Sequence, residues 1–471
     1  MSTSVPQNTA EARGSNLPDN NMPAPDTENL ISWDTHHVWH AFTQMQEYES
    51  LLLERGEGCW LIDTSGKKYL DGSASMWCNV HGHGHPRLNA AIIDQLHKVA
   101  HTTNLGLSNP TTVEFAHRLT QITPAGLEHV FFSDDGSTAI EAALKIAFQF
   151  WLQTDPARPR PKQKYVAIGD AYHGDTLGAI GVGGVDRFTS MFMPLTFESI
   201  RIPSPAATSS SPNKPHLSCN ESLAYLEQVF NDHSGDISAM IMEPMVQAAG
   251  GILVHPPGFL AGVRKLTQKH DILLILDEVA TGFGRTGSMF ACEQENVVPD
   301  ILCIAKGLTA GYLPMAATLT NNQIWSAFLG SSEERRTFYH GHTYGGNPLA
   351  AAAGIESLNL FRDENVLAQM PAKIDRLRQH VCRIEKLKHV GDARQCGLMA
   401  GFELMLDKTS QKPFPWQEQR GSHACRFARN HNVLLRPLGD VVVIMPPLSI
   451  SLDEIDMLAE ATEKGIIEAT T

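Results

Sequence analysis

The chain has 471 residues, of which 42% are hydrophobic and 19% charged, and this composition suits a large globular protein with more than one subdomain. The formal net charge of −14 argues against nucleic acid or an anionic membrane surface as a partner, because both would need a basic face. No apolar stretch approaches the roughly 18 residues of a membrane-spanning helix, and the eight cysteines are scattered without a CxxC pair. We therefore expect a cytoplasmic protein without a disulfide framework or a zinc site.

The N-terminal segment, residues 1–30, lacks an apolar core of the kind found in signal peptides. It carries one arginine among four acidic residues, which does not fit a transit peptide, so we expect a disordered tail. Residues 59–71 predict a β-hairpin, since two short apolar runs flank a turn that contains Gly66. We assign residues 31–87 to the N-terminal part of a smaller domain.

Residues 88–350 are expected to form a large α/β domain. Continuous apolar runs alternate there with helical patterns, which is typical of a mostly parallel sheet covered by helices on both faces. The expected strands are residues 129–132, 165–168, 239–242, 272–276, 301–305 and 315–319. The segment 203–220 is rich in Ser, Pro and Asn, and it predicts a surface excursion without a role in the chemistry.

The pattern changes at residue 351, and residues 351–471 predict a smaller α+β domain. Its expected strands are residues 388–392, 398–404 and 441–445. A last helix is expected to begin at Ser451, because Ser451 and Glu454 match the capping-box pattern.

Two charged residues follow neighbouring strands of the large domain. Asp277 ends the strand 272–276 and Lys306 follows the strand 301–305, 306 − 277 = 29 residues later and therefore one crossover away. Either residue alone could simply mark where a strand leaves the core. Together, at the sheet edge where ligands of open α/β sheets bind, they suit pyridoxal phosphate. That cofactor needs a lysine for its aldehyde and a carboxylate for its ring nitrogen.

Two further segments would complete such a site. Gly136 and Ser137 precede a helix that the capping-box pair Thr138 and Glu141 predicts, and a helix N-terminus binds phosphate through its N–H groups and dipole. An ordinary capped helix has the same pattern. Tyr172 follows the strand 165–168, where an aromatic ring can stack on a flat cofactor or merely cover the core.

Two other patterns suggest different chemistry. Gly282–Gly287 matches the dinucleotide-binding pattern GxGxxG, but its first glycine lies five residues beyond Asp277 and no helical pattern follows. His81, His83 and His85 alternate as ligands on a strand face would, but the intervening glycines indicate a loop, and no nearby acid or cysteine completes the set. We therefore expect neither a nicotinamide cofactor nor a metal ion.

With these residues in view, residues 276–287 and 299–307 resemble the class III aminotransferases that use pyridoxal phosphate, and the resemblance extends over residues 35–465. It implies PLP fold type I: a large domain with a mostly parallel, seven-stranded sheet, and a smaller α+β domain built from both termini. It also implies a homodimer with its active sites at the interface.

Within that class the chain is most similar to the branch that transaminates 8-amino-7-oxononanoate to 7,8-diaminononanoate in biotin biosynthesis, with S-adenosylmethionine or lysine as amino donor. The stretches that carry this similarity are residues 37–43, 79–86, 171–178, 340–348 and 435–439. The alternative within the class is a broad-specificity ω-aminotransferase acting on aliphatic amines. A non-enzymatic pyridoxal-phosphate-binding protein and a nicotinamide reductase are more distant alternatives.

The resemblance implies roles residue by residue. Lys306 would be the Schiff-base lysine and Asp277 the partner of the ring nitrogen. The other cofactor-binding residues would be Gly136, Ser137 and Tyr172, with His342 and Thr343 from the neighbouring subunit. The substrate-binding residues would be Phe42, Met76, Tyr172, Arg285, Gly341 and Arg436.

Two of these substrate-binding residues receive a more specific role. Arg436 matches the arginine that receives the carboxylate of the oxononanoate, and a bidentate guanidinium suits that task. Arg285 would shape the donor pocket, although either arginine could instead form a surface salt bridge. Phe42 and Met76 stand where relatives commonly carry tyrosine and tryptophan, and this departure is closer to the members that use lysine.

Overall fold

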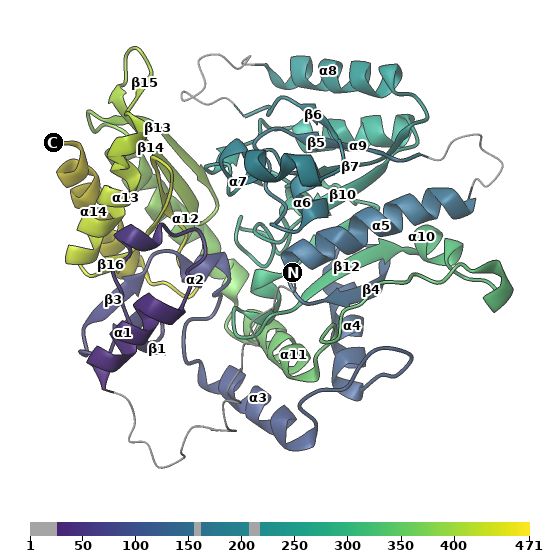
Figure 1. Ribbon diagram of the computed structural model, residues 1–471, viewed down its shortest axis with the longest axis horizontal. Helices are drawn as coiled ribbons and strands as arrows, with labels where there is room; N and C mark the ends of the chain where they lie inside the picture. Colours follow the sequence, from purple (N-terminus) through teal and green to yellow (C-terminus); the bar gives the residue numbers. More distant parts are fainter. Residues whose placement is uncertain (1–25, 155–161, 207–216) are drawn as a thin grey trace, which may run out of the picture. The chain divides into compact units, whose positions relative to one another are not determined.

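The computed structural model describes residues 26–154, 162–206 and 217–471, and Figure 1 shows the arrangement of their helices and strands. The chain divides into two units. The first comprises Met1–Arg55 with Ile62–Lys67, and the second comprises Gly56–Leu61 with Lys68–Thr471. Residues 207–216 of the predicted surface excursion lie outside the described residues.

The first unit contains helix α1 (Thr27–His37) and the short helix η1 (Met45–Glu47). Helix α1 starts where the Asp26 carboxylate accepts a hydrogen bond from the Asn29 N–H at 2.8 Å. A carboxylate at this position satisfies an unpaired N–H and interacts favourably with the helix dipole. The predicted disordered tail is therefore wrong for residues 27–30, and residues 1–25 lie outside the described part of the chain.

Three short strands follow: β1 (Leu53–Glu57), β2 (Trp60–Asp63) and β3 (Lys68–Asp71). The predicted hairpin at residues 59–71 is present, since the Asp71 N–H donates to the Cys59 carbonyl at 2.8 Å. Strand β3 also pairs in parallel with β16 (Val433–Leu434). Segments from the two ends of the second unit thus share one sheet.

The second unit contains a seven-stranded sheet in the order β4-β12-β11-β10-β7-β5-β6. In that order, the strands are Leu127–Ser133, Ala316–Asn321, Ile301–Ile304, Leu273–Asp277, Ile237–Met242, Lys164–Ile168 and Ile200–Ile202. Strand β12 runs antiparallel to both of its neighbours, and the other adjacent pairs are parallel. The predicted mostly parallel sheet is confirmed, and six of its strands lie within two residues of the predicted bounds. The short edge strand β6 was not predicted.

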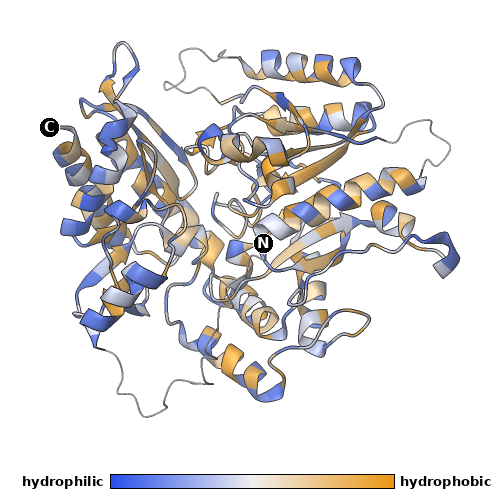
Figure 2. Ribbon diagram, viewed as in Figure 1, coloured by the Kyte–Doolittle hydropathy of each residue, from blue (hydrophilic) through white to orange (hydrophobic). Residues whose placement is uncertain are grey.

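Alternation of side chains along the central strands builds a core on each face of the sheet. On one face, Met240 and Leu274 belong to a cluster with residues of helices α4, α8, α9 and α11. On the other face, Ile241 and Ile275 belong to a cluster with residues of α5, α6 and α10. Because β7, β10 and β11 are buried along their whole length, their sequences are continuous apolar runs, and Figure 2 shows them as hydrophobic.

The helices around this sheet have the following bounds: α3 (Pro86–Lys98), α4 (Pro110–Ile122), α5 (Gly136–Thr154), α6 (Leu177–Val182), α7 (Asp186–Thr189), α8 (Cys219–Asp232), α9 (Phe259–Lys269), α10 (Asn322–Ala327) and α11 (Pro348–Asp363). Within the described residues, every helix is too short or too polar to span a bilayer.

The C-terminal part of the second unit holds a five-stranded sheet built on β13-β14-β18-β17. Its strands are β13 (Val390–Cys396), β14 (Met399–Asp407), β15 (Lys412–Pro413), β17 (Arg436–Leu438) and β18 (Val441–Ile444). Its helices are α12 (Val366–Ile384), α13 (Arg420–Asn430) and α14 (Leu452–Thr470). Helix α14 begins with the predicted capping box of Ser451 and Glu454. The domain boundaries at residues 87/88 and 350/351 stay predictions.

Candidate active site

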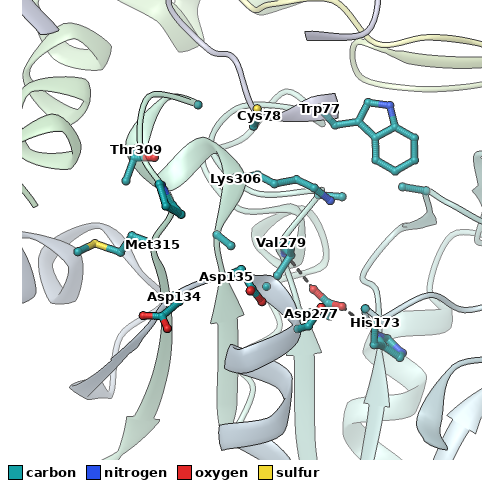
Figure 3. A pocket seen from close by; sticks show the side chains of 18 of the residues that line it. Trp77, Cys78, Asp134, Asp135, His173, Asp277, Val279, Lys306, Thr309 and Met315 are labelled. Atoms are coloured by element: carbon teal, nitrogen blue, oxygen red, sulfur yellow. Dashed lines mark hydrogen bonds and ion pairs between the residues drawn. The ribbon is translucent and has the colours of Figure 1, made fainter. Parts of the chain in front are cut away.

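A cavity of about 390 Å³ lies at the carboxyl ends of the large sheet (Figure 3). Five strands bring residues to it: the segments after β4, β5 and β7, the end of β10 and the start of the loop after β11. Residues 309–315 and the short helix α2 (Ala74–Trp77) add the remaining walls. The cavity therefore occupies the edge of the sheet at which the sequence predicted a ligand.

Lys306 and Asp277 both line this cavity, as predicted from their strand ends. The Lys306 ammonium nitrogen lies 5.2 Å from the centre of the Trp77 ring, and Lys306 has a left-handed backbone with φ of +46°. Burial lowers the pKa of the Lys306 amine, and the nearby carboxylates of Asp277 and Glu243 oppose that shift. Burial thus favours the uncharged amine, which is the form that attacks a carbonyl carbon.

The Asp277 carboxylate is 4% exposed and has a partner at each oxygen. His173 Nδ1 lies 2.7 Å from Oδ2, and the Val279 N–H donates to Oδ1 at 3.0 Å (Figure 3). Because an ionised carboxylate only accepts hydrogen bonds, we assign the His173 proton to Nδ1. These two bonds hold Asp277 in one orientation while it lines the cavity.

The sequence assigned no role to His173 or to Glu243, and both line the cavity. Glu243 accepts hydrogen bonds from the N–H groups of Tyr172 at 3.2 Å and Ala248 at 2.8 Å. Burial raises the pKa of the Glu243 carboxyl to about 7, with Asp277 adding to the shift and His173 opposing it. Their positions directly after Tyr172 and after strand β7 were the available signal, since those strand ends belong to the same edge of the sheet.

The expected phosphate-binding residues lie at the start of α5, which begins at Gly136. The predicted capping box of Thr138 and Glu141 is wrong. Asp135 caps the helix by accepting from the Thr138 N–H at 3.0 Å, and Glu141 accepts instead from the Gly178 N–H at 2.7 Å. Thr138 lies inside the helix, so its hydroxyl bonds back to the Asp135 carbonyl.

The N-terminus of α5 fits a phosphate group. Gly136 and Ser137 belong to the first turn, where backbone N–H groups have no acceptor within the helix. A side chain at Gly136 would bring its Cβ to 2.7 Å from Val279 Cγ1, so only glycine leaves the turn open at this point. Free N–H groups, the helix dipole and the Ser137 hydroxyl together form the kind of cradle that an anionic group requires.

Tyr172 forms part of the cavity wall, as predicted. Its hydroxyl donates to Asp175 Oδ2 at 2.7 Å, and its ring lies edge-on to Phe188 at 5.8 Å between centroids. Burial, together with the bond to Asp175, raises the pKa of the Tyr172 hydroxyl. The ring is thereby held as a neutral, flat surface beside the cavity.

The two predicted arginines differ in their surroundings. Arg436, on β17, is half-buried, and its guanidinium carbon lies 5.8 Å from the centre of the Trp77 ring that lines the cavity. Arg285 is buried and donates to the backbone carbonyls of Pro446 and Asn79. Burial lowers the pKa of Arg285 to about 10. Because Arg285 is buried, the surface salt bridge that the sequence left open does not apply to it. The roles of both arginines toward a substrate stay predictions.

The other predicted site residues lie outside the set that lines this cavity. Met76 directly precedes Trp77 and is 44% exposed. Gly341, His342 and Thr343 are exposed, with His342 Nδ1 at 3.7 Å from Asp134 Oδ2. Phe42 belongs to the first unit and is also exposed. The roles assigned to these residues stay predictions.

The two competing patterns have structural explanations. His83 Nε2 lies 2.9 Å from Asp71 Oδ2, whereas His81 Nε2 lies 3.0 Å from the Ser357 hydroxyl. The described ranges contain no group of three or more potential ligands that could hold a metal ion. Gly282–Gly287 forms consecutive turns, so it lacks the strand–turn–helix geometry of a dinucleotide site.

Comparison with known proteins agrees with this geometry. The family model described as aminotransferase class-III matches residues 43–466. Adenosylmethionine-8-amino-7-oxononanoate aminotransferase of Geobacter sulfurreducens is 48% identical over 95% of this chain and 100% of its own length. The corresponding protein of Aquifex aeolicus is 46% identical over 94% of this chain and 98% of its own length.

Solved structures of aminotransferases are also similar to this chain over nearly its whole length. The crystal structure of adenosylmethionine-8-amino-7-oxononanoate aminotransferase from Methanocaldococcus jannaschii has a TM-score of 0.89 at 38% identity, covering 95% of this chain and 100% of its own. An (S)-enantioselective omega-transaminase from Thermomicrobium roseum has a TM-score of 0.88 at 34% identity, with the same coverage.

The position of Lys306 generates a test that does not depend on the substrate. We expect borohydride treatment of the protein with pyridoxal phosphate to attach the cofactor permanently to the peptide that contains Lys306, as read by mass spectrometry. Lys306→Ala should abolish both this label and the visible absorption of the bound cofactor. Lys164→Ala, at the start of β5, serves as the control and should label like the unmodified chain. A label on a different lysine would contradict the assignment.

Burial of Glu243 generates a test by pH. Its pKa is raised from 4.5 to about 7, so the folded chain binds more protons than the unfolded chain between these values, and stability should fall as pH rises through this window. The loss attributable to Glu243 should be about 3 kcal/mol. Glu243→Gln, which stays neutral, should flatten the curve of unfolding free energy between about pH 4.5 and 7, whereas Glu460→Gln on the surface of α14 should not. Parallel curves for Glu243→Gln and the unmodified chain would show that this carboxyl does not titrate as described.

Proposed function

Because the chain belongs to the class III aminotransferases, we propose that it transfers an amino group to 8-amino-7-oxononanoate and thereby forms 7,8-diaminononanoate in biotin biosynthesis. Its cofactor is pyridoxal phosphate. The observation that carries the proposal is one cavity lined by Lys306, Asp277 and the N-terminus of α5, with Arg436 beside its Trp77 wall. The curated relatives that carry this name are similar to the chain over nearly its whole length.

Different residues of the cavity would bind different parts of this cofactor. Gly136 and Ser137 would hold its phosphate at the helix N-terminus, and Asp277 would keep a proton on its ring nitrogen. Bound pyridoxal phosphate supplies an aldehyde that condenses with amines and a protonated ring that withdraws electrons from the adjacent carbon. His173 and the Val279 N–H hold the Asp277 carboxylate in place for that contact.

Lys306 is the group that moves protons. Burial favours its uncharged amine, which would take a proton from the substrate carbon that bears nitrogen and deliver it to the cofactor carbon bonded to the same nitrogen. The neighbouring Trp77 ring stabilises the ammonium form through a cation–π contact at 5.2 Å. The pKa of Lys306 is thus set between two opposing influences, which suits a group that must both accept and release a proton.

The substrate chemistry fits Arg436. The oxononanoate has a long apolar chain with one carboxylate at the end remote from its ketone, so a single cationic anchor with apolar walls would position it. Trp77, Ala248 and Ala249 supply apolar surface in the cavity, and the Arg436 guanidinium adjoins that surface at Trp77.

The amino donor is the open part of this proposal. The names of the similar proteins indicate adenosylmethionine as their amino donor. Phe42 and Met76, in contrast, depart from the residues common in the family and favour lysine as the donor. A broad ω-aminotransferase is the second candidate function, because a solved omega-transaminase shares the fold at a TM-score of 0.88.

The proposal includes a homodimer located in the cytoplasm. Exposed aromatic side chains flank residues 341–343 in the sequence, since Tyr339 is 80% exposed and Tyr344 62%. A second copy that covered this surface would also bring His342 and Thr343 to the phosphate-binding end of its partner's cavity.

The first test is product formation. The cofactor-loaded protein is incubated with 8-amino-7-oxononanoate and adenosylmethionine, lysine, glutamate or alanine in separate reactions, and 7,8-diaminononanoate is sought by mass spectrometry. We expect product with adenosylmethionine or lysine. Arg436→Ala should raise the KM for the oxononanoate by about 10- to 100-fold, the value of a charge-assisted hydrogen bond. Arg378→Ala, on the exposed face of α12, is the control. Activity on simple amines without any diamine would favour the ω-aminotransferase.

A second test addresses the shared site by mixing inactive subunits. Lys306→Ala and Thr343→Arg chains should each be inactive as homodimers. If Thr343 serves the neighbouring site, a mixed dimer contains one site with both defects and one intact site, so activity should return after the chains are mixed and exchanged. No recovery, with mixed dimers confirmed by native mass spectrometry, would place Thr343 in the site of its own chain or outside both sites.

A further inference from the structure

A second arginine, the exposed Arg187, lies near the aromatic side chains that Arg436 also adjoins. Its guanidinium carbon lies 4.8 Å from the centre of the Phe188 ring, and Phe188 lies edge-on to Tyr172. Tyr172 and Trp77 line the cavity, and Arg436 lies over the Trp77 ring. Phe188 and Tyr172 also pack against one buried cluster that contains Trp77. The Arg436 guanidinium therefore adjoins the wall at Trp77, and the Arg187 guanidinium is connected to it through Phe188.

The Arg187 side chain extends to the hairpin that carries Arg436. Its Nη1 lies against Gly439, where a side-chain carbon would collide with it, and Gly439 has a φ of +65°. Gly439 belongs to the turn between β17 and β18, and β17 begins with Arg436. The absence of a side chain at residue 439 thus leaves room for the Arg187 guanidinium, three residues from Arg436.

The charges around Arg187 leave it without a close anionic partner. Among the described residues, no carboxylate lies within ion-pair distance of Arg187, although Asp440 acts on it at longer range. Asp440 itself accepts a hydrogen bond from the Gly421 N–H at 3.1 Å. Arg394 shows the contrast, because it pairs with Glu403 at 2.7 Å and with Asp392 at 2.9 Å.

The two guanidinium groups also act on each other. Arg187 lowers the pKa of Arg436, in addition to the larger effect of burial, so the two groups lie within electrostatic range. Two like charges near one aromatic wall repel each other, and a bound carboxylate would relieve that repulsion. Guanidinium groups bind carboxylates in a planar, directional way, so two of them can contact the two oxygens of one carboxylate.

We propose that Arg187 is a second carboxylate-binding residue, which together with Arg436 forms a two-guanidinium site for substrates whose chain ends in a carboxylate. The inference rests on the proposed function, because it names the part of the oxononanoate that Arg187 recognises. It also accounts for selectivity: a simple aliphatic amine lacks the group that would offset the repulsion between the two arginines, so the site favours substrates that carry a carboxylate at the far end.

The test compares binding and turnover in the cofactor-loaded protein. Octanoate, a carboxylate-terminated chain without an amine, and its uncharged analogue octanamide are titrated by calorimetry into the unmodified chain and into Arg187→Ala. We expect Arg187→Ala to weaken octanoate binding by about 5- to 20-fold and to leave octanamide binding unchanged, as for loss of one charge-assisted contact. The KM for the oxononanoate should rise by a similar factor, with kcat within about twofold.

Three controls make the outcome specific. Arg187→Lys should retain part of the octanoate affinity, because it keeps the charge but loses the fork. Arg378→Ala should bind both probes like the unmodified chain. Arg187→Ala combined with Arg436→Ala should lose less octanoate affinity than the sum of the single losses, as two residues on one carboxylate predict.

The inference and the proposed function can fail separately. Octanoate binding that is equal in Arg187→Ala and the unmodified chain, in protein with an unchanged melting temperature, would overturn the inference. Equal loss of octanoate and octanamide would do the same, since it would indicate a packing role. If the unmodified chain forms no diamine but its octanoate binding still depends on Arg187, the choice of substrate is wrong and the carboxylate site stands.

Discussion

The candidate site is organised around one carboxylate, Asp277, that is held in one orientation where water is almost excluded. A buried carboxylate is costly unless hydrogen bonds compensate it, and the fold supplies these from His173 and from the Val279 N–H. Strand β10 brings Asp277 to the cavity, β5 brings His173, and the parallel register places Asp277 opposite Cys303 on β11. Lys306 follows three residues later. The order of strands in the sheet thus determines which polar groups meet.

The other charged groups near the cavity have surroundings of their own. Glu243, after β7, lies near Asp277, and burial raises the pKa of the Glu243 carboxyl. The positive groups all lie beside aromatic rings: Lys306 and Arg436 lie 5.2 Å and 5.8 Å from the centre of the Trp77 ring, and Arg187 lies 4.8 Å from that of Phe188.

Much of the fold could be predicted from the sequence, because fully buried strands such as β7 and β10 are continuous apolar runs with charged residues at their ends. Asp277 and Lys306 were predictable for this reason. The short edge strand β6 was not, because it has only three residues, of which Ile202 alone is buried, and these carry too little pattern. Pairings such as His173 with Asp277 join residues 104 positions apart, and no local spacing reports them. The predicted start of α5 was wrong for a related reason. Asp135 and Thr138 can both cap a helix, and Glu141 would complete a capping box with Thr138. In the structure Glu141 instead accepts from the Gly178 N–H, a distant partner, and Asp135 is the cap.

One residue joins the two ends of the proposed cofactor site. The Val279 N–H holds the Asp277 carboxylate, and the Val279 side chain is the group that a Cβ at Gly136 would meet. The acid at one end and the anion cradle at the other are therefore fixed against a single valine, which acts as a spacer of constant length. The distance between these two ends is therefore fixed. A molecule whose phosphate and basic nitrogen are separated by a different distance would occupy one end of the site and leave the other unfilled.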